Sequence, residues 1–339
     1  MNFAICLTKF YISRCEALLS SLKNYNINIY LLCFDRESYK YFYKKNVNCI
    51  TINKIKSFEK NFDATIKNRK LIDQIVTSRP IFLKFLLKKF NLKEIFLLDS
   101  DIFFFSDPKN IKKEIGKASI AYCDHRFNKK LKKLADMYGK YNAGFIYIKF
   151  DKYGKKFLNE WSSLCKEWCE FTPSLNKFSD QKYLEQLKKK SNNIKIIKNP
   201  CINLAPWNLQ CKEIVKKEET ILVNNKPLIF FHFHGLRKLT NNIYVLGTSN
   251  YNFFLTTNIK KILFAPYINY LKNHKSKDFF WKKNSLIDLF IKSYIVFKKI
   301  ILNDFYLVKK IVTHEKSINN WNNRTDRSLL SRVVVKKKL

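Results

Sequence analysis

Glycine, proline and acidic residues are scarce in this sequence. Its 339 residues include 6 Gly, 7 Pro and 27 Asp plus Glu, against 65 Lys plus Arg. So few glycines, with no Gly-Lys-Ser or Gly-Lys-Thr step, argue against a P-loop kinase, which needs such a loop to hold its phosphates. The chain also lacks an apolar run of about 18 residues, so no transmembrane helix is expected.

The cysteines do not form a pattern of disulfide or zinc ligands. There are nine, an odd number, at irregular spacing. Cys165 and Cys169 would share one face of a helix, but no second pair stands at zinc-like spacing. Reduced, buried thiols are therefore expected, as in cytosolic proteins. Residues 1–15 have no basic segment before their apolar stretch, so we expect no signal peptide and a cytoplasmic location.

Positive charge is what the sequence has in excess. The formal net charge is +38, and hydrophobic residues make up 46% of the chain, enough for a full core. The basic residues are nearly all Lys and are spread from end to end, as an A/T-rich coding bias would produce. This charge favours anionic partners such as nucleotide phosphates and anionic lipid head groups. No basic-aromatic recognition motif stands out, so specific nucleic-acid binding is not expected.

Apolar segments alternate with segments of helical periodicity. The pattern predicts strands over residues 2–8, 27–35, 47–53, 94–101, 118–124, 143–150, 194–199 and 227–235, and helices over 13–25 and 78–90. The second helix would have Ser78 near its N-cap and Pro80 in its first turn. This alternation predicts an α/β fold with a mostly parallel sheet and helices on both faces, in which ligands bind beyond the carboxyl ends of the strands.

The chain changes character near residue 250. Residues 1–250 carry the α/β pattern, and 251–339 read as a Lys-rich, C-terminal helical extension, so we place a loose domain boundary there. Packing on the catalytic domain is favoured for residues 259–272. A helix over 286–302 would gather its charged residues on one face, and it could either pack on the protein or lie on an anionic membrane surface.

Two aspartates, Asp99 and Asp101, end the apolar segment EIFLLDSDIFFF. A buried pair of carboxylates repels itself unless a cation neutralises it, and hard oxygen ligands suit Mg²⁺ or Mn²⁺. Such an ion takes the rest of its ligands from phosphates, so the segment predicts a diphosphate-binding site. The alternative is a solvated turn, with Ser106 and Pro108 as ordinary turn residues.

A histidine pair lies in the later segment IFFHFHG. The period-2 pattern of a strand puts His232 and His234 on one face. Neutral imidazole is a common metal ligand, and Gly235 would let backbone or phosphate come close. Both histidines could equally be hydrogen-bonded polar groups at a strand end. The spacing to Gly235 and Lys238 favours His232 as the ligand.

The segment FLLDSDIFFF resembles the D-x-D element of nucleotide-sugar glycosyltransferases with the GT-A fold. Four further segments are similar, in order, to those of glycosyltransferase family 8, which includes glycogenin and bacterial lipopolysaccharide galactosyltransferases: YNAGFIYIKF, FSDQKYL, NLAPWNL and HFHGLRK. Together they cover residues 3–238. The resemblance implies the GT-A type of mixed, mostly parallel sheet, with the helical extension following it.

The resemblance also implies ligands for a cation and a diphosphate. Asp99, Asp101 and His232 would bind Mn²⁺ or Mg²⁺, and Lys238 would contact the diphosphate. Lys84 stands where the family often has an Arg on the helix before the D-x-D strand, so it would contact phosphate or sugar.

Further residues would surround the sugar. By the resemblance, Asn142 would line the sugar and acceptor side, Asp180 would hold donor-sugar hydroxyls, and Gln181 would lie near the anomeric carbon. Asp180 and Gln181 could equally cap a helix. Trp207 could stack on a sugar ring or belong to the core, and Asn208 could donate to a hydroxyl.

The implied function is a metal-dependent transfer of sugar from a nucleotide-sugar donor to a glycan or lipid-linked acceptor, in the synthesis of cell-surface polysaccharide or lipopolysaccharide. A lipid-linked acceptor would suit peripheral contact with the inner face of the membrane. The family commonly follows its lysine with Pro-Trp, whereas Leu239 and Thr240 follow Lys238. This departure leaves the donor and the stereochemical course open.

Two rival functions fit parts of the sequence. The segment LLDSDIFF superficially resembles the D-x-D start of haloacid-dehalogenase phosphatases and phosphotransferases, but that class needs the motif at its first strand and a Gly where Ile102 stands. A non-catalytic basic protein that binds nucleic acid or membrane by charge is the other rival. Changing Asp99 and Asp101 to Ala separates them, because only the transferase should lose metal-dependent nucleotide binding.

Overall fold

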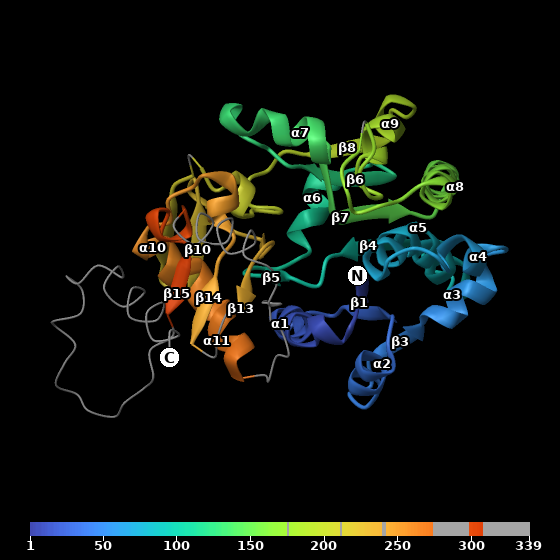
Figure 1. The fold of residues 1–339 in the computed structure, drawn as a ribbon, viewed down its shortest axis with the longest axis horizontal. Coiled ribbons are helices and arrows are strands. Elements are labelled where there is room, and N and C mark those ends of the chain that lie inside the picture. The colour runs from blue at the N-terminus through green and yellow to red at the C-terminus, as the bar shows by residue number, and fades with distance from the viewer. Residues whose placement is uncertain (175, 211, 239–241, 274–297, 308–339) are drawn as a thin grey trace, which may run out of the picture.

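The structure is a computed structural model, and it describes residues 1–174, 176–210, 212–238, 242–273 and 298–307 (Figure 1). Its largest sheet has seven strands in the order β3-β2-β1-β4-β7-β6-β8. They are β1 (Asn2–Leu7), β2 (Asn28–Cys33), β3 (Asn48–Thr51), β4 (Glu94–Leu98), β6 (Ile120–Asp124), β7 (Tyr141–Lys149) and β8 (Ile194–Ile197). β7 is antiparallel to both of its neighbours, and the other pairs are parallel. The expected mixed, mostly parallel sheet is confirmed.

Helices cover both faces of this sheet, as expected. They are α1 (Ile12–Leu22), α2 (Arg36–Tyr43), α3 (Ile52–Phe58), α4 (Phe62–Ile66), α5 (Leu71–Lys89), α6 (Asn110–Ile115), α7 (Lys132–Tyr138), α8 (Lys152–Glu167) and α9 (Tyr183–Lys189). Side chains of a strand alternate between faces. Phe3 and Ile5 of β1 therefore join the core under α1, whereas Ala4 joins the core under α5 and α8.

Helix α5 is longer than the sequence pattern indicates. It begins at Leu71, seven residues before the expected start, and contains Pro80 in its interior. Ser78 does not cap the helix, because its hydroxyl donates to the carbonyl of Gln74 at 2.7 Å. A proline inside a helix removes one backbone hydrogen bond. The buried face that α5 packs against the sheet and α8 offsets this loss, so tertiary packing overrides the local signal.

A short antiparallel pair brings distant segments together at the edge of the D-x-D loop. β5 (Ile102–Phe104) pairs with β12 (Phe230–His232), with Ile102 opposite His232. The amide of Phe233 donates to the carbonyl of Asp101 at 2.8 Å. This register sets His232 beside the aspartates, although more than a hundred residues separate them in the sequence.

Two small sheets and a helical segment lie beside this pair (Figure 1). The strands are β9 (Ile214–Lys217), β10 (Thr220–Val223), β11 (Lys226–Pro227), β13 (Arg237–Lys238), β14 (Ile243–Val245) and β15 (Phe305–Leu307). The segment comprises α10 (Thr257–Ile259), a π-helix (Lys260–Phe264) and α11 (Ala265–Asn273), and short 3₁₀ turns cover Lys9–Tyr11, Lys129–Leu131, Pro206–Asn208 and Thr248–Tyr251. Leu263, Tyr267 and Leu271 join the core that contains β1 and α1, so the predicted packing of this segment is confirmed.

One buried acid ties the far end of the described chain to the 3₁₀ turn at Thr248–Tyr251. Asp304 accepts hydrogen bonds from the amide and hydroxyl of Thr248 and from the hydroxyl of Ser249, each at 2.7 Å. Lys299 pairs with it at 3.1 Å. β15 also pairs with β14, so residues on both sides of position 250 share one sheet. The domain boundary proposed near that position stays a prediction.

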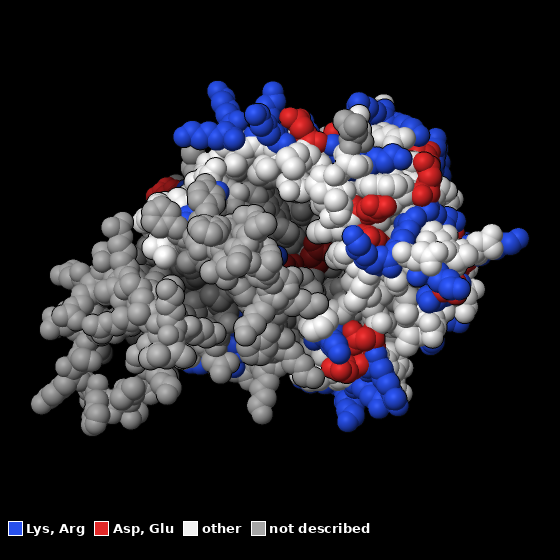
Figure 2. Space-filling view, viewed as in Figure 1, with Lys and Arg blue, Asp and Glu red and all other residues white. Residues whose placement is uncertain are grey.

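Among the helices of the described ranges, none is both long enough and apolar enough to cross a bilayer. The predicted amphipathic helix over 286–302 falls mostly outside the described residues. Figure 2 shows Lys and Arg side chains in several clusters around the described surface, with acidic side chains set back in a hollow near the centre of the view.

Candidate active site

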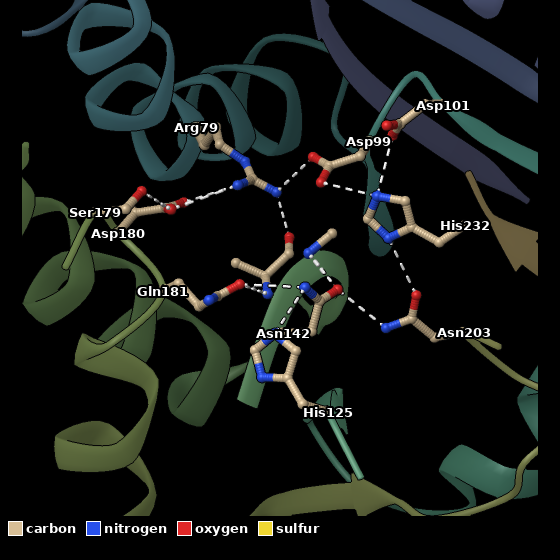
Figure 3. Close-up of polar contacts among 12 residues, drawn as sticks. Arg79, Asp99, Asp101, His125, Asn142, Ser179, Asp180, Gln181, Asn203 and His232 are labelled. Carbon is tan, nitrogen blue, oxygen red and sulfur yellow. Dashed lines mark hydrogen bonds and ion pairs between the residues drawn. The ribbon is translucent and has the colours of Figure 1, made fainter. Parts of the chain in front are cut away.

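A cavity of about 500 Å³ opens beyond the carboxyl ends of β1 and β4. Residues from many separated parts of the chain line it, including Thr8, Arg79, Asp99, Asp101, His125, Asn142, Asp180, Gln181, Trp207, His232, His234 and Tyr251. The location agrees with the general position of ligand sites in α/β sheets. Sequence segments that are far apart therefore contribute polar side chains to one enclosed space (Figure 3).

The two aspartates follow β4 directly. Asp99 is held in place by its backbone, because its amide donates to the carbonyl of Gly144 at 2.9 Å. Its side chain is 37% exposed and that of Asp101 is 13% exposed. The loop therefore presents both carboxylates to the cavity, while the preceding strand is buried in the core.

His232 lies against both carboxylates. Its Nε2 is 3.0 Å from Oδ1 of Asp101 and 3.7 Å from Oδ2 of Asp99. Burial would lower the pKa of His232, but the nearby charges of Asp101 and Asp99 outweigh burial and raise this pKa. Burial would likewise raise the pKa of Asp101, and the charge of His232 more than offsets it, so this pKa is held below its usual value. The charges of Asp101 and His232 thus each favour the charged form of the other.

A chain of amides fixes which nitrogen of His232 carries its other hydrogen. The amide of Gly144 donates to Oδ1 of Asn142 at 3.0 Å, which fixes the orientation of that side chain. Nδ2 of Asn203 donates to the same oxygen at 3.0 Å, so Oδ1 of Asn203 faces the histidine. Nδ1 of His232 lies 3.3 Å from that oxygen and must donate to it (Figure 3). Nε2 is then the nitrogen that is free to bind a cation.

The arrangement fits a divalent cation. Nε2 of His232 is buried and makes no hydrogen bond with the described part of the chain, although two carboxylates surround it. A neutral imidazole would aim a lone pair at negative oxygens, which is unfavourable unless a positive charge lies between them. Two aspartates and one imidazole are ordinary ligands for such an ion, and the asparagine behind the imidazole is the outer partner that such ligands have.

Arg79 is a site residue that the sequence reasoning missed. It lies on α5 and its guanidinium is 3.1 Å from Oδ1 of Asp99 and 3.2 Å from Oδ2 of Asp180. It also donates to the carbonyl of Ala143. Burial would lower the pKa of Arg79, but the charges of Asp180 and Asp99 raise it above its usual value. Arg79 therefore links the D-x-D loop to the loop before α9.

Lys84, which was expected to contact phosphate or sugar, lies elsewhere. It pairs with Glu59 at 3.2 Å and is not among the residues that line the cavity. Five residues of helix turn a side chain about 140° around the axis, so Lys84 and Arg79 lie on different faces of α5. The helix does supply a basic residue to the cavity, but one that stands five positions earlier.

Asp180 and Gln181 face the cavity and do not cap a helix. Asp180 is 1% exposed and accepts from the hydroxyl of Ser179 at 3.0 Å as well as from Arg79. Oε1 of Gln181 accepts from the amide of Ala143 at 3.0 Å and from Nδ2 of Asn142 at 3.2 Å. The N-cap of α9 is instead Lys182, which makes no side-chain cap bond. Both side chains thus form part of the cavity wall.

Trp207 and Asn208 are buried beside the cavity and support the residues that line it. Trp207 lines the cavity but is only 2% exposed, so its ring is mainly a packing surface. Nδ2 of Asn208 donates to the carbonyls of His125 and Asn203, and its Oδ1 accepts from the amide of Ala205. Asn208 is not among the lining residues.

His125 lines the cavity as a neutral side chain. Burial lowers the pKa of His125 to about 3. Its ring stacks on Phe127, with centroids 4.7 Å apart, and its Nε2 lies 3.2 Å from Nδ2 of Asn142. It therefore supports Asn142.

Gly235 and Lys238 lie beyond the histidine strand. Gly235 has a positive φ of 79°, and the backbone of Gly247 passes close to it. A Cβ on Gly247 would lie 2.8 Å from the carbonyl oxygen of His234, so glycine is needed there for close approach. Lys238 lies on β13 and, like Gly235, is not among the residues that line the cavity.

Gly144 leaves room for the cation ligands. A Cβ at this position would lie 2.6 Å from Cε1 of His232 and 2.8 Å from Oδ2 of Asp99. Such distances are shorter than van der Waals contact, so any side chain would displace the ligands. The Asn-Ala-Gly segment at the start of β7 thus contributes an amide at Asn142 and free space at Gly144.

Comparison with known proteins gives the following matches. The model of the nucleotide-diphospho-sugar transferase family matches residues 27–241. Two uncharacterised proteins of Bacillus subtilis (strain 168) are similar: YfnD is 27% identical over 277 residues, 80% of this chain and 88% of that protein. YfnF is 29% identical over 255 residues, 71% of this chain and 84% of that protein. The crystal structure of galactosyltransferase LgtC with donor and acceptor sugar analogs has a TM-score of 0.48 at 12% identity, covering 80% of this chain and 95% of that one.

Proposed function

Because this chain belongs to the family of nucleotide-diphospho-sugar transferases, we propose that its cavity binds a nucleotide-sugar donor together with a divalent cation and transfers the sugar to an acceptor hydroxyl. Membership of this family identifies the protein as a nucleotide-sugar glycosyltransferase. It disfavours the two rival functions, a phosphatase and a non-catalytic protein that binds by charge. The metal, the acceptor and the roles of individual residues are the parts that we propose.

The observation that carries the proposal is the position of Nε2 of His232. It faces Asp99 and Asp101, and its tautomer is set by Asn203. These three side chains would hold Mn²⁺ or Mg²⁺, with the donor diphosphate completing the ligand sphere. When bound, such a cation offsets the negative charge that develops on the leaving nucleoside diphosphate. Lys238 would add a second positive charge at the diphosphate.

The neighbouring wall would hold the sugar. Asp180 would accept hydrogen bonds from donor-sugar hydroxyls. Burial raises the pKa of Asp180, and Arg79 opposes this rise while it holds the carboxylate in place. Gln181 would lie near the anomeric carbon. Because its oxygen already accepts two hydrogen bonds and its nitrogen donates to the carbonyl of Tyr138 at 2.8 Å, we assign it to positioning. Asn142 would contribute to the sugar and acceptor side.

The acceptor would be a glycan or a lipid-linked glycan. Apolar side chains at the cavity support the lipid-linked form: Tyr11, Ile72 and Phe171 line the cavity and are 37%, 40% and 44% exposed. The charge of +38 favours an anionic membrane surface nearby. A cytoplasmic enzyme that works peripherally at the inner face of the membrane, in the synthesis of cell-surface polysaccharide or lipopolysaccharide, would use both features.

A thermal-shift screen of nucleotide sugars with Mn²⁺ tests this function. The correct donor should raise the melting temperature more than its nucleoside monophosphate does, and the increase should disappear in Asp99→Asn and Asp101→Asn. Lys84→Met is the control, because Lys84 pairs with Glu59 outside the cavity, and it should respond as the wild type does. If no nucleotide sugar stabilises the protein more than the monophosphates do, the proposed donor site is wrong.

A further inference from the structure

A second imidazole stands next to the proposed cation ligands. One ligand atom each of Asp101, His232 and His234 lies within 4.8 Å of the others. Two atoms that bind the same ion can be no more than about 4–5 Å apart, since each lies 2.0–2.6 Å from it. His234 also lines the cavity. His234 is therefore within reach of an ion held by Asp101 and His232; Asp99 does not belong to this group of mutually close ligand atoms among the described residues.

The orientation of both imidazoles is supported by the same tryptophan. The ring of Trp207 meets His232 edge-on at 5.1 Å and His234 at 5.4 Å between centroids. The two imidazole planes are nearly perpendicular, at 88°, with centroids 5.8 Å apart. Rings that share one support are pre-oriented for a common target. The close approach of Gly247 to the carbonyl of His234 holds the backbone at this point.

We propose that His234 is a further protein ligand of the cation, beside Asp101 and His232, and that it makes the site select Mn²⁺ or Co²⁺ over Mg²⁺. The inference rests on the proposed cation site, but it differs from the expectation drawn from the sequence, in which His232 alone of the two histidines binds the ion. His234 is exposed, so the ion would remain accessible to the donor diphosphate.

The chemistry of the ligands explains the selectivity. Mg²⁺ prefers oxygen ligands, keeps several waters and is usually held by one or two carboxylates together with phosphates. Imidazole binds later transition metals better, in the order Mn²⁺, Fe²⁺, Co²⁺. Asp101, His232 and His234 supply three protein ligands, two of them nitrogen. Such a site favours Mn²⁺ or Co²⁺ even before a nucleotide binds.

Counting the nitrogen ligands of bound Mn²⁺ tests the proposal without any activity measurement. Electron spin-echo envelope modulation of the full-length protein, loaded with Mn²⁺ and no nucleotide, should show coupling to two imidazole nitrogens. In His234→Asn only one should remain. Removing even an outer partner of a metal ligand costs ~10–100-fold in affinity, so the loss of this ligand should weaken Mn²⁺ binding at least about tenfold. Binding of Mg²⁺, measured by competition, should weaken much less.

His234→Asp separates the role of a ligand from that of a general polar group. A carboxylate at this position should restore cation binding and shift the Mg²⁺-to-Mn²⁺ affinity ratio toward Mg²⁺. Asn250→Ala is the matched control, since Asn250 lines the same cavity, and it should keep the wild-type affinity and ratio. Circular dichroism shows that each variant is folded.

The outcomes divide cleanly. A single imidazole coupling in the wild type, or equal losses of Mn²⁺ and Mg²⁺ binding in His234→Asn, would overturn the proposal. The same holds if His234→Asn keeps its Mn²⁺ affinity and loses only nucleotide diphosphate binding, because His234 would then contact phosphate. Two imidazole couplings in a protein that uses no nucleotide sugar would retain this inference and remove the proposed transfer. Sugar transfer by a protein that shows only one imidazole coupling would support the proposed function and overturn this inference.

Discussion

The two walls of the cavity use their polar atoms in different ways. On the wall formed by Arg79, Asn142, Asp180 and Gln181, which we term the framework wall, each side chain hydrogen-bonds to other groups of the protein. On the wall formed by Asp99, Asp101 and His232, the cation wall, Nε2 of the histidine faces carboxylates without a hydrogen bond among the described residues. In Figure 3, Arg79, Asp180 and Gln181 lie on one side of Asp99, and Asp101 and His232 lie on the other.

This difference separates two kinds of loss. Groups of the framework wall exchange water for protein partners on folding, so removing one leaves a buried partner unsatisfied and should reduce stability. In the cation wall the two aspartates repel each other, which offsets part of their attraction to His232, so this wall should contribute less to folding. Their removal should reduce function most. Stability and activity measured in parallel on both walls therefore test the comparison.

Asp101→Asn should have the largest effect on function. The charge stabilisation that a cation supplies is worth several kcal/mol, so metal-stimulated sugar transfer should fall roughly a thousandfold. The free energy of unfolding without metal should change less than in the Arg79 variant below. Metal titrations of the initial rate, together with urea unfolding, give both values. A variant that unfolds more easily than the Arg79 variant but keeps its activity would reverse the roles of the walls.

Arg79→Met should have the largest effect on stability. It leaves Asp180 without its positive partner at a position that is 1% exposed. Breaking a buried pair from one side costs about 3–5 kcal/mol, and urea unfolding should show a loss of that size. Arg79→Lys should recover part of it, because one ammonium cannot reach Asp99, Asp180 and a carbonyl as the planar guanidinium does. Equal stability of the Met and Lys variants would contradict this explanation.

The sequence indicated the cation wall better than the framework wall. Asp99, Asp101 and His232 lie at the ends of apolar strands. The alternation of strands and helices predicts ligand-binding residues there, and the family resemblance indicates the same three residues. Arg79 lies in the middle of a helix whose start was placed one residue before it, because Pro80 is typical of a first turn. Propensity could not reveal the tertiary packing that keeps this proline inside a longer helix.

The residue type itself could have identified Arg79 as a site residue from the sequence. In a chain whose basic residues are nearly all lysine, the arginines at 14, 69, 79 and 126 each donate to backbone carbonyls that are distant in sequence. Lysine cannot replace a fork of several donors, so a rare arginine indicates a fixed internal contact. Asn203 gave no signal, because its role depends on a hydrogen-bond chain that forms only in the folded protein.

Asn203→Leu should have an intermediate effect and connects the two walls. The substitution removes the acceptor for Nδ1 of His232 and the donor to Asn142. The tautomer of the imidazole is then no longer set, and the affinity for Mn²⁺ should fall ~10–100-fold, as for other outer partners of metal ligands. Mn²⁺ titration by electron paramagnetic resonance measures this directly. Unchanged affinity would mean that the cation wall does not depend on the framework behind it.

Lys84→Met should have the smallest effect. Lys84 pairs with Glu59, which keeps a second partner in Lys166 at 2.6 Å. The free energy of unfolding should fall by no more than about 1 kcal/mol, the usual size of a partly exposed ion pair. Sugar transfer and metal affinity should match the wild type. A strong loss of donor binding in this variant would mean that Lys84, and not Arg79, is the basic residue of α5 that acts in the site.

The attachment of Asp304 to Thr248 and Ser249 has a consequence for biosynthesis. Asn250 and Tyr251, which line the cavity, follow the turn that this acid fixes. A ribosome must therefore release residue 304 from its exit tunnel before this side of the pocket can acquire its final form. A nascent chain that stalls at residue 300 would contain every proposed cation ligand. It would still lack Asp304, which fixes the turn before Asn250 and Tyr251.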